Sequence, residues 1–503
     1  MAIHFINADL VKVYRTTEKK KNNIRTVLAW GDEVEVSQLN ANQADIIFRD
    51  FKENPDGSIL PIDTHGFILK GSSGPSLSKV LRPIGEKNVL KISFVDVQQG
   101  DGCVIETPKG KVILLDGGEN QMFARYLAAR YSGSSPDNPK IIECIVVSHG
   151  DADHFAGLPE ILKSETQEYP KKRLFINPLR VYHNGIVKRP GKTPAGTKRK
   201  DTELLGGTAK KGNQLYLTEL EENLLDVANE KLNAPFKKWK SALKEYNDFY
   251  SNSILFKRLD HQSSTDFHFL ADENINVQVL GPISEKLNNK PALKFLRQPP
   301  KSVAAEVEEN LPPSGAYSAS HTINGHSIIL RMTYGNINFL FAGDLNEEAE
   351  DLIVAEANST PIRSEVLKVP HHGSADFSNK FFEAVQPLVS VVSSGDESEM
   401  KEYIHPRATL VGALGKYSRI NRPLIFITEL VAFFKKEGWA KSTEKNSSEF
   451  FAFSRTAYGV VHVRTDGKRI LVFTHSGQKD LKEAYSYEIS SNGTPTRKDI
   501  VMV

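Results

Sequence analysis

The feature that most constrains the fold of this chain is an apolar run, residues 141–148, that ends directly on a polar hexapeptide. A short apolar run of this kind predicts a strand that is buried on both faces. After residue 88, further apolar strands alternate with helical stretches, a pattern typical of layered α/β proteins. The sequence therefore predicts a layered α/β fold with this strand inside it.

The hexapeptide, His149-Gly150-Asp151-Ala152-Asp153-His154, contains four groups that can bind a metal ion. So many titratable groups beside a buried strand would leave uncompensated charge unless a cation or a dense hydrogen-bond network met them. A polar surface turn is the alternative interpretation. The position at a strand end and the motifs downstream favour a metal centre.

The spacing His149-x-Asp151-x-Asp153-His154 is similar to the His-x-His-x-Asp-His signature of the metallo-β-lactamase superfamily, with Asp151 in place of the second histidine. That replacement is typical of a subgroup, the hydrolase domain of ComEC-type DNA-uptake proteins and their soluble relatives. Further segments resemble this subgroup in the expected order: residues 94–101, 114–118, 324–330, 339–344 and 367–374. The resemblance covers roughly residues 88–475 and implies an αββα sandwich. The membrane-spanning part of ComEC proteins has no counterpart here, so DNA transport is not implied.

The resemblance also implies a pair of divalent cations, Zn²⁺ or Mn²⁺, that share a bridging carboxylate. Asp344 is the expected bridge, although an ordinary turn-forming Asp after Gly343 is the alternative. Either His371 or His372 can be the ligand in the segment 367–374, and the sequence favours His371. The expected ligands are His149 and Asp151 for one ion, and Asp153, His154 and His371 for the other.

The first ion lacks an obvious third protein ligand, for which His183, His321 and His326 are the candidates. Surface or substrate-contacting histidines are the alternative. Among the expected catalytic residues are Asp153, His372 and His405, the last as a substrate contact or proton donor. Asp116 and Asp101 are expected to orient ligands rather than bind metal, and a plain turn role is the alternative for Asp116.

Domain organisation follows from changes in pattern along the chain. Residues 1–75 predict a small β domain that resembles an SH3-like barrel and ends in the linker Gly71-Ser72-Ser73-Gly74-Pro75. Residues 88–480 form the predicted hydrolase domain, with an insertion at about 185–310, and residues 481–503 are expected to be a C-terminal tail. The insertion carries a basic loop that is expected to bind substrate through Lys188, Arg189, Lys198, Arg199 and Lys200, although such charge runs are often solvated loops.

Composition excludes several classes of protein. The two cysteines, Cys103 and Cys144, cannot form a disulfide framework or a cysteine-rich zinc module, and this usage suits a reducing, cytoplasmic compartment. We expect neither a signal peptide nor a membrane span. The net charge of +2 means that any nucleic-acid binding must come from a local patch.

Phosphodiester hydrolysis of DNA or RNA is the leading functional prediction, because the resemblance implies a nuclease or phosphodiesterase and the basic loop suits phosphates. Hydrolysis of a small phosphoester or cyclic ester is the second. The third is a metal-binding component of a multi-protein defence or stress system, with little activity alone. Expected partners are nucleic acid and proteins bound through the N-terminal domain, but not a membrane.

Overall fold

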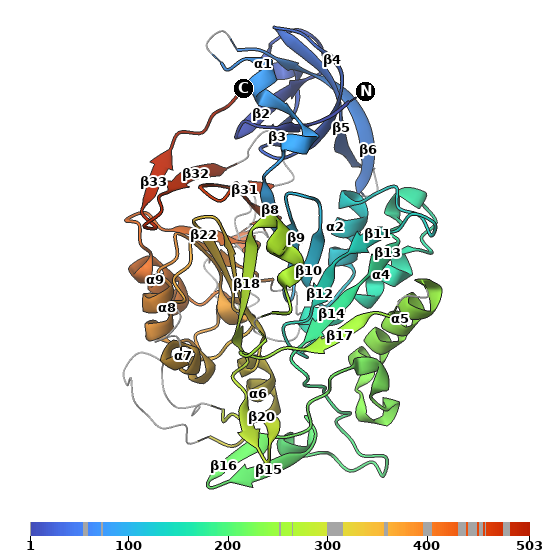
Figure 1. Ribbon diagram of the computed structural model, residues 1–503, viewed down its shortest axis with the longest axis vertical. Helices are drawn as coiled ribbons and strands as arrows, with labels where there is room; N and C mark the ends of the chain where they lie inside the picture. The colour runs from blue at the N-terminus through green and yellow to red at the C-terminus, as the bar shows by residue number, and fades with distance from the viewer. Residues whose placement is uncertain are drawn as a thin grey trace.

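The computed structural model describes residues 2–53, 59–71, 74–250, 253–263, 265–298, 315–356, 361–395, 405–430, 439–440, 450–451, 456–457, 459–475 and 483–503. Two β-sheets face each other in the middle of the molecule, and a separate β domain lies at one end (Figure 1). Within the described residues, none of the helices combines the length and the apolar character needed to cross a bilayer.

The first sheet of the sandwich contains the apolar strands of the N-terminal half of the hydrolase domain. Its strands lie in the order β17 (Leu255–Arg258), β14 (Arg180–His183), β12 (Cys144–Val146), β10 (Val112–Asp116), β9 (Gly102–Glu106), β8 (Leu90–Phe94), β30 (Val460–Thr465), β31 (Arg469–His475), β32 (Ala484–Ile489) and β33 (Pro495–Lys498). The run 141–148 forms two short strands, not one, because Glu143 interrupts it and pairs with Arg180 at 3.0 Å. β11 (Lys140–Ile142) pairs with β13 (Ile176–Pro178) beside the sheet, while β12 lies within it.

The second sheet lies in the order β18 (Ile275–Gly281), β21 (Ile329–Tyr334), β22 (Ile337–Phe341), β23 (Val366–Lys368), β24 (Val389–Val392) and β25 (Leu424–Ile427). Apolar side chains from both sheets form one shared core, to which Ile113, Val146, Leu330, Phe339 and Val391 contribute. Two sheets that meet in this way bury the inner face of each.

Helices cover the outer faces of both sheets. On the first sheet lie α2 (Met122–Arg130), α4 (Pro159–Ser164) and α5 (Ala234–Tyr250), which share a core with its strands. On the second lie α7 (Glu347–Glu356), α8 (Asn379–Val385) and α9 (Ala408–Tyr417). Figure 1 shows the two groups of helices on opposite sides of the strands. The layers are therefore α, β, β and α, as the sequence predicted.

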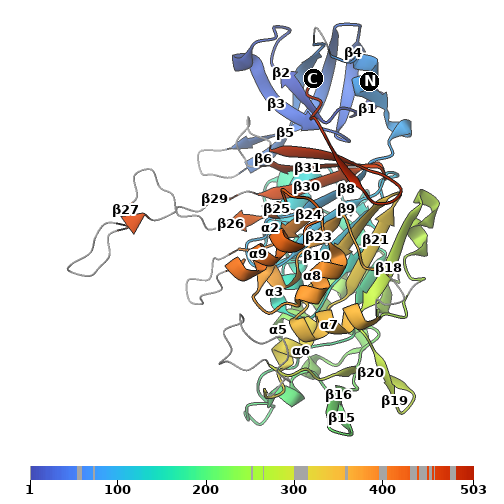
Figure 2. The same cartoon turned by 90° about the vertical axis from the view of Figure 1, so that its left-hand side faces the viewer.

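The N-terminal domain is a curled sheet with the order β3 (Ile24–Ala29), β2 (Leu10–Tyr14), β6 (Ile59–Leu69), β5 (Gln43–Glu53), β4 (Glu33–Leu39), β1 (Ala2–Ile6) and β7 (Leu81–Pro83). Short helix α1 (Leu77–Val80) leads into β7. Trp30 is buried with Val89, Leu471 and Phe473 at the junction with the first sheet. The domain is thus packed against the sandwich rather than tethered to it (Figure 2).

The structure differs from two predicted boundaries. Residues 481–503 are not a free tail: β32 and β33 extend the first sheet, and Val503 N donates to Leu10 O at 3.0 Å in the N-terminal domain. The reason is that Tyr487 and Ile489 alternate with polar residues and are buried, as in a half-buried strand. Residues 481 and 482 lie outside the described part of the chain.

The predicted insertion, residues 185–310, is not wholly separate from the sandwich. β17 pairs with β14 at the edge of the first sheet, and β18 pairs with β21 at the edge of the second. Val277 and Val279 of β18 lie in the shared core, which explains the pairing. Away from the sandwich lie β15 (Thr208–Lys211), β16 (Gln214–Leu217), β19 (Glu285–Leu287) and β20 (Lys290–Lys294), with α6 (Ala319–Gly325) nearby. Residues 299–314 are outside the described residues.

A few short elements complete the fold. They are α3 (Ala152–Phe155), the paired strands β26 (Glu429–Leu430) and β29 (Thr456–Ala457), and the paired strands β27 (Trp439–Ala440) and β28 (Phe450–Phe451).

Candidate metal centre

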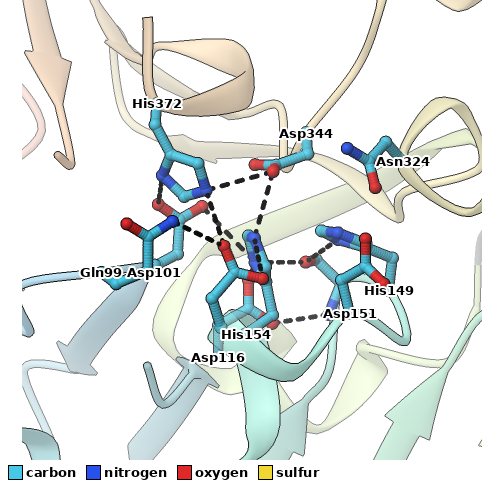
Figure 3. Close-up of polar contacts among 12 residues, drawn as sticks. Gln99, Asp101, Asp116, His149, Asp151, His154, Asn324, Asp344 and His372 are labelled. Carbon is cyan, nitrogen blue, oxygen red and sulfur yellow. Dashed lines mark hydrogen bonds and ion pairs between the residues drawn. The ribbon is translucent and has the colours of Figure 1, made fainter. Parts of the chain in front are cut away.

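Parallel strands bring the polar motifs to one edge of the sandwich. β10 and β12 are parallel in the first sheet, and β22 and β23 are parallel in the second. The carboxyl ends of parallel strands meet at the same edge, so the residues after them converge. Asp116 ends β10, His149 follows β12, Asp344 follows β22 and His372 follows β23. These side chains point toward one another in Figure 3.

Four side chains form the tightest group, which we call the four-ligand group: Asp153, His154, Asp344 and His372. One potential ligand atom from each lies within 4.8 Å of all the others. Asp344 Oδ2 is 3.2 Å from His154 Nε2 and 3.1 Å from His372 Nε2. His372 Nε2 is also 3.4 Å from Asp153 Oδ2. Two imidazole nitrogens and two carboxylates so arranged match the donors that divalent transition metals bind.

Neighbouring groups hold each imidazole by its Nδ1 atom. His154 Nδ1 lies 3.0 Å from Asp116 Oδ2, and His372 Nδ1 lies 2.9 Å from the Ser393 carbonyl oxygen. His149 Nδ1 lies 3.1 Å from Ser148 Oγ. The Nε2 atom of His149 is buried and makes no hydrogen bond within the described part of the chain, whereas the Nε2 atoms of His154 and His372 are directed at Asp344 Oδ2. Histidines anchored at one ring nitrogen, with the other directed into the site, are typical metal ligands, so the residues present fit a divalent ion.

Electrostatics support the same interpretation. Burial lowers the pKa of His149 well below its ordinary value, so its imidazole is neutral. Burial also acts to lower the pKa of the other two histidines, but the nearby carboxylates, Asp344 first, outweigh it. They raise the pKa of His154 well above its ordinary value and that of His372 to about 10. The carboxylates thus keep the imidazoles of His154 and His372 protonated and positively charged. A divalent ion would displace these two protons.

Three contributing residues had not been predicted. Buried Lys368 forms an ion pair with Asp101 and donates to the Gly343 carbonyl at 2.9 Å. Gln99 Nε2 donates to Asp153 Oδ2 at 3.3 Å, and Asn324 contacts the Asp151 turn. A lysine at the end of an otherwise apolar strand directly before Val369-Pro370-His371-His372 is a signal that could have identified Lys368. Asp101 itself lies beside the ligands, with its Oδ1 atom 3.5 Å from His372 Nδ1.

The structure differs from the prediction that His371 would be the ligand in the second motif. His371 and His372 both have left-handed backbone conformations, with φ of 46° and 52°. Non-glycine residues pay a conformational cost there, and such residues cluster at functional sites. The resulting turn directs His372 into the four-ligand group, whereas His371 Nε2 lies 3.3 Å from the side-chain amide of Asn324.

The predicted site of the first ion, at His149 and Asp151, is arranged differently from the four-ligand group. Lys188 Nζ lies 2.7 Å from Asp151 Oδ1. Asn324, with its amide oriented to accept from His371 Nε2, donates to Asp151 Oδ2 at 3.0 Å. Both carboxylate oxygens of Asp151 are therefore engaged by protein groups. Neither His149 nor Asp151 joins a group of converging ligand atoms among the described residues.

None of the three candidates for the third ligand of the first ion joins a group of converging ligand atoms within the described residues. His183 uses both ring nitrogens on backbone groups, with Nε2 3.1 Å from Glu222 O and Nδ1 accepting from Gly185 N at 3.0 Å. His326 Nε2 is 2.6 Å from Lys294 O. His321 Nδ1 faces Asp376 Oδ2 at 3.6 Å. The local sequence could not reveal these competing partners, which come from other segments.

The remaining predicted residues lie around the centre or away from it. The ring of His405 is centred 6.3 Å from that of His371, and burial and the neighbouring histidines lower its pKa to about 4. Arg189 pairs with Glu219 at 2.5 Å rather than facing solvent. Lys198 and Lys200 are exposed, and Arg199 is half-buried.

Comparison with known proteins bears on the same region. Residues 95–166 match the metallo-β-lactamase superfamily. ComE operon protein 3 of Bacillus subtilis (strain 168) is 32% identical over 97 residues, which are 19% of this chain and 12% of that protein. Competence protein ComA of Neisseria gonorrhoeae is 37% identical over 84 residues, 16% of this chain and 12% of that protein. The chain thus aligns with only about an eighth of the length of these relatives.

Solved structures with some similarity include Tm1679, a metal-dependent hydrolase of the β-lactamase superfamily, at 11% identity and a TM-score of 0.29, covering 67% of this chain and 95% of that one. A long form RNase Z from yeast has 10% identity and a TM-score of 0.24, covering 68% of this chain and 37% of that one. With scores this low, the fold assignment depends on the superfamily match and the observed topology. The αββα layers and the motifs at their strand ends make this a metallo-β-lactamase-fold protein whose matched segment is ComEC-like.

Proposed function

We propose that this chain is a metal-dependent hydrolase that cleaves phosphodiester bonds in DNA or RNA. The observation that carries the proposal is the convergence of two carboxylates and two buried imidazoles, whose Nε2 atoms both face Asp344 Oδ2. A buried cluster of carboxylates and imidazoles is costly unless a cation or a dense hydrogen-bond network compensates it, so this arrangement suits a divalent ion.

A divalent ion bound to the four-ligand group would supply Lewis-acid chemistry that activates water and stabilises negative charge on a phosphate. The chain's own residues hold and orient that centre. Asp153, His154, Asp344 and His372 are the ligands, and Asp116 and the Ser393 carbonyl fix the imidazoles that they contact. Mixed nitrogen and carboxylate donors suit Zn²⁺ and also Mn²⁺.

His405 is proposed to contact the substrate or to pass a proton. Its ring lies beside that of His371, outside the four-ligand group. With a pKa lowered to about 4 by burial and by the nearby histidines, it is neutral near pH 7 and able to accept a proton.

The phosphodiester part of the proposal draws on charge and on similarity. The basic loop begins at Lys188, directly beside Asp151, and continues through Lys192, Lys198 and Lys200, which are exposed. Exposed lysines near a cleavage site neutralise phosphates and make binding strongly dependent on salt. The two curated relatives are competence proteins, which is consistent with a nucleic-acid substrate.

The test is cleavage of circular single-stranded DNA, circular double-stranded DNA and RNA by the purified chain, with Zn²⁺, Mn²⁺ or Mg²⁺. We expect metal-dependent cleavage that EDTA abolishes and that Asp344→Ala lacks. Asp63→Asn is the matched control, because Asp63 is an exposed carboxylate in the N-terminal domain, 3.3 Å from Arg49. Absence of cleavage on all three substrates with every ion would contradict the proposal.

A further inference from the structure

The carboxylate of Asp151 is bound by a lysine and an amide, whereas Asp344 of the four-ligand group faces two imidazoles that can themselves bind a metal ion. The Oδ1 atom of Asp151 meets the Lys188 ammonium at 2.7 Å, and its Oδ2 atom accepts from the Asn324 amide at 3.0 Å. By contrast, Asp344 Oδ1 makes no hydrogen bond within the described residues, and Asp344 Oδ2 faces His154 Nε2 at 3.2 Å and His372 Nε2 at 3.1 Å. The side chains within 3.2 Å of Asp344 Oδ2 are thus imidazoles that can act as co-ligands of a cation, whereas at Asp151 a lysine ammonium is already bound.

The fold places Lys188 at this carboxylate through contacts on both sides of it. The Lys188 carbonyl accepts from Asn233 N at 2.9 Å, and the next amide, that of Arg189, donates to Leu204 O at 2.8 Å. On the facing turn, a Cβ on Gly150 would lie 3.2 Å from Ile186 O and 2.8 Å from Phe236 Cζ. The segment leading to Lys188 therefore packs closely on the turn between His149 and Asp151, which keeps the ammonium within reach of Asp151.

The surroundings of His149 nevertheless suit a side chain that binds a second metal ion. It is 1% exposed, and Ser148 Oγ and Ser327 Oγ lie 3.1 and 3.3 Å from its Nδ1 atom. Its Nε2 atom makes no hydrogen bond in the part of the chain that the structure describes. Together with Asp151 and Asp344 Oδ1, which lies 3.8 Å from Lys368 Nζ, His149 would supply donors for a second cation if the Lys188 ammonium were absent, although these donor atoms do not converge with Lys188 in place.

We propose that the Lys188 ammonium takes the place of a second cation at Asp151, so that this chain binds one divalent ion tightly in the four-ligand group and a second only weakly. An ammonium and a divalent cation repel each other and compete for the same carboxylate. Lys188 thereby sets the number of ions in the centre. This inference depends on the metal centre of the proposed function, but not on which substrate is cleaved.

The test measures the number of metal ions bound per chain and does not depend on catalytic activity. Wild type, Lys188→Met, Lys188→Arg and Lys192→Met would be stripped with EDTA and equilibrated with Zn²⁺ alone. Bound zinc per chain would then be measured by native mass spectrometry and by elemental analysis. Lys188→Arg keeps the positive charge, and Lys192→Met removes an exposed lysine of the same loop. We expect one tightly bound ion in wild type and in both of these controls, and two in Lys188→Met, with at least a tenfold gain in affinity for the second ion.

The inference is overturned if wild type binds two ions with similar affinity, if Lys188→Met still binds one, or if neither binds any. A chain that binds one ion, gains a second in Lys188→Met and yet cleaves neither DNA nor RNA would support this inference while contradicting the phosphodiester proposal. Circular dichroism of all variants would verify folding. Lys188 is a partly exposed side chain, at 30% exposure, so its replacement is compatible with the fold.

Discussion

The candidate centre has two parts, the four-ligand group and the site at His149 and Asp151. Both include residues of the turn 149–154, but their surroundings differ. Asp153 and His154 face Asp344 and His372 across the two sheets, so that carboxylates and imidazoles converge. Asp151, two residues earlier, is engaged by Lys188 and Asn324. The difference shows that a ligand-rich motif does not by itself specify how many cations bind. The count depends on which side chains the rest of the fold brings to each carboxylate.

The largest expected effect separates the two aspartates of that turn. Asp153→Asn removes a charged ligand of the four-ligand group, so we expect Zn²⁺ affinity to fall about 1000-fold, equivalent to about 4 kcal/mol. Asp151→Asn should leave the affinity for the first ion almost unchanged, because Asp151 is outside that group. Competition with a chromogenic chelator measures both. Equal losses of Zn²⁺ affinity in Asp153→Asn and Asp151→Asn would mean that both aspartates contribute to the same metal site.

Each part of the centre also holds an ammonium, and the two should differ in their effect on stability. Lys368 is buried, with its side chain 5% exposed, and forms an ion pair with Asp101. Lys368→Met leaves that carboxylate uncompensated, which should lower the free energy of unfolding by about 3 kcal/mol. Lys188→Met, at the more exposed pair, should change it by less than about 1 kcal/mol. Urea denaturation in EDTA checks both, and a stable Lys368→Met chain would contradict the expected role of Lys368.

The groups that orient the histidines provide a smaller contrast. Asp116 accepts from Ser148 N at 2.7 Å and faces His154 Nδ1 at 3.0 Å. Loss of such an orienting group costs about 10- to 100-fold in metal affinity, which we expect for Asp116→Asn. Ser327→Ala removes a hydroxyl 3.3 Å from His149 Nδ1, in the other part of the centre, and should affect the ion in the four-ligand group less. The reverse order in metal titrations would argue that the tight site includes His149.

Per pH unit, the smallest effect is the dependence of stability on pH in the metal-free chain. The folded chain raises the pKa of His372 to about 10, whereas an unfolded histidine titrates near about 6.5. The stabilisation is therefore complete below about pH 6.5 and is lost as the pH rises toward 10, by on the order of 1 kcal/mol per pH unit. Urea denaturation in EDTA across this range measures the slope. His372→Gln should flatten it, and an unchanged slope would assign the effect to other groups.

The layered fold and the position of the centre could be predicted from sequence. Apolar strands that end on His149, Asp344 and the His371-His372 pair are readable because strands bury their side chains and ligands follow strand ends. Domain edges were harder to predict. β17, β18, β32 and β33 join the sandwich through pairing with strands distant in sequence, which local periodicity cannot reveal.

The sequence by itself determined the ligand types, their order and the strands that carry them, because those depend on short-range pattern. Only the tertiary structure decided which histidine of the His371-His372 pair faces the centre, since a left-handed turn has no side-chain periodicity to read. It also decided that Lys188, 37 residues after Asp151, meets that carboxylate. Contacts between distant segments depend on packing, and here packing determines which carboxylates remain open to a cation.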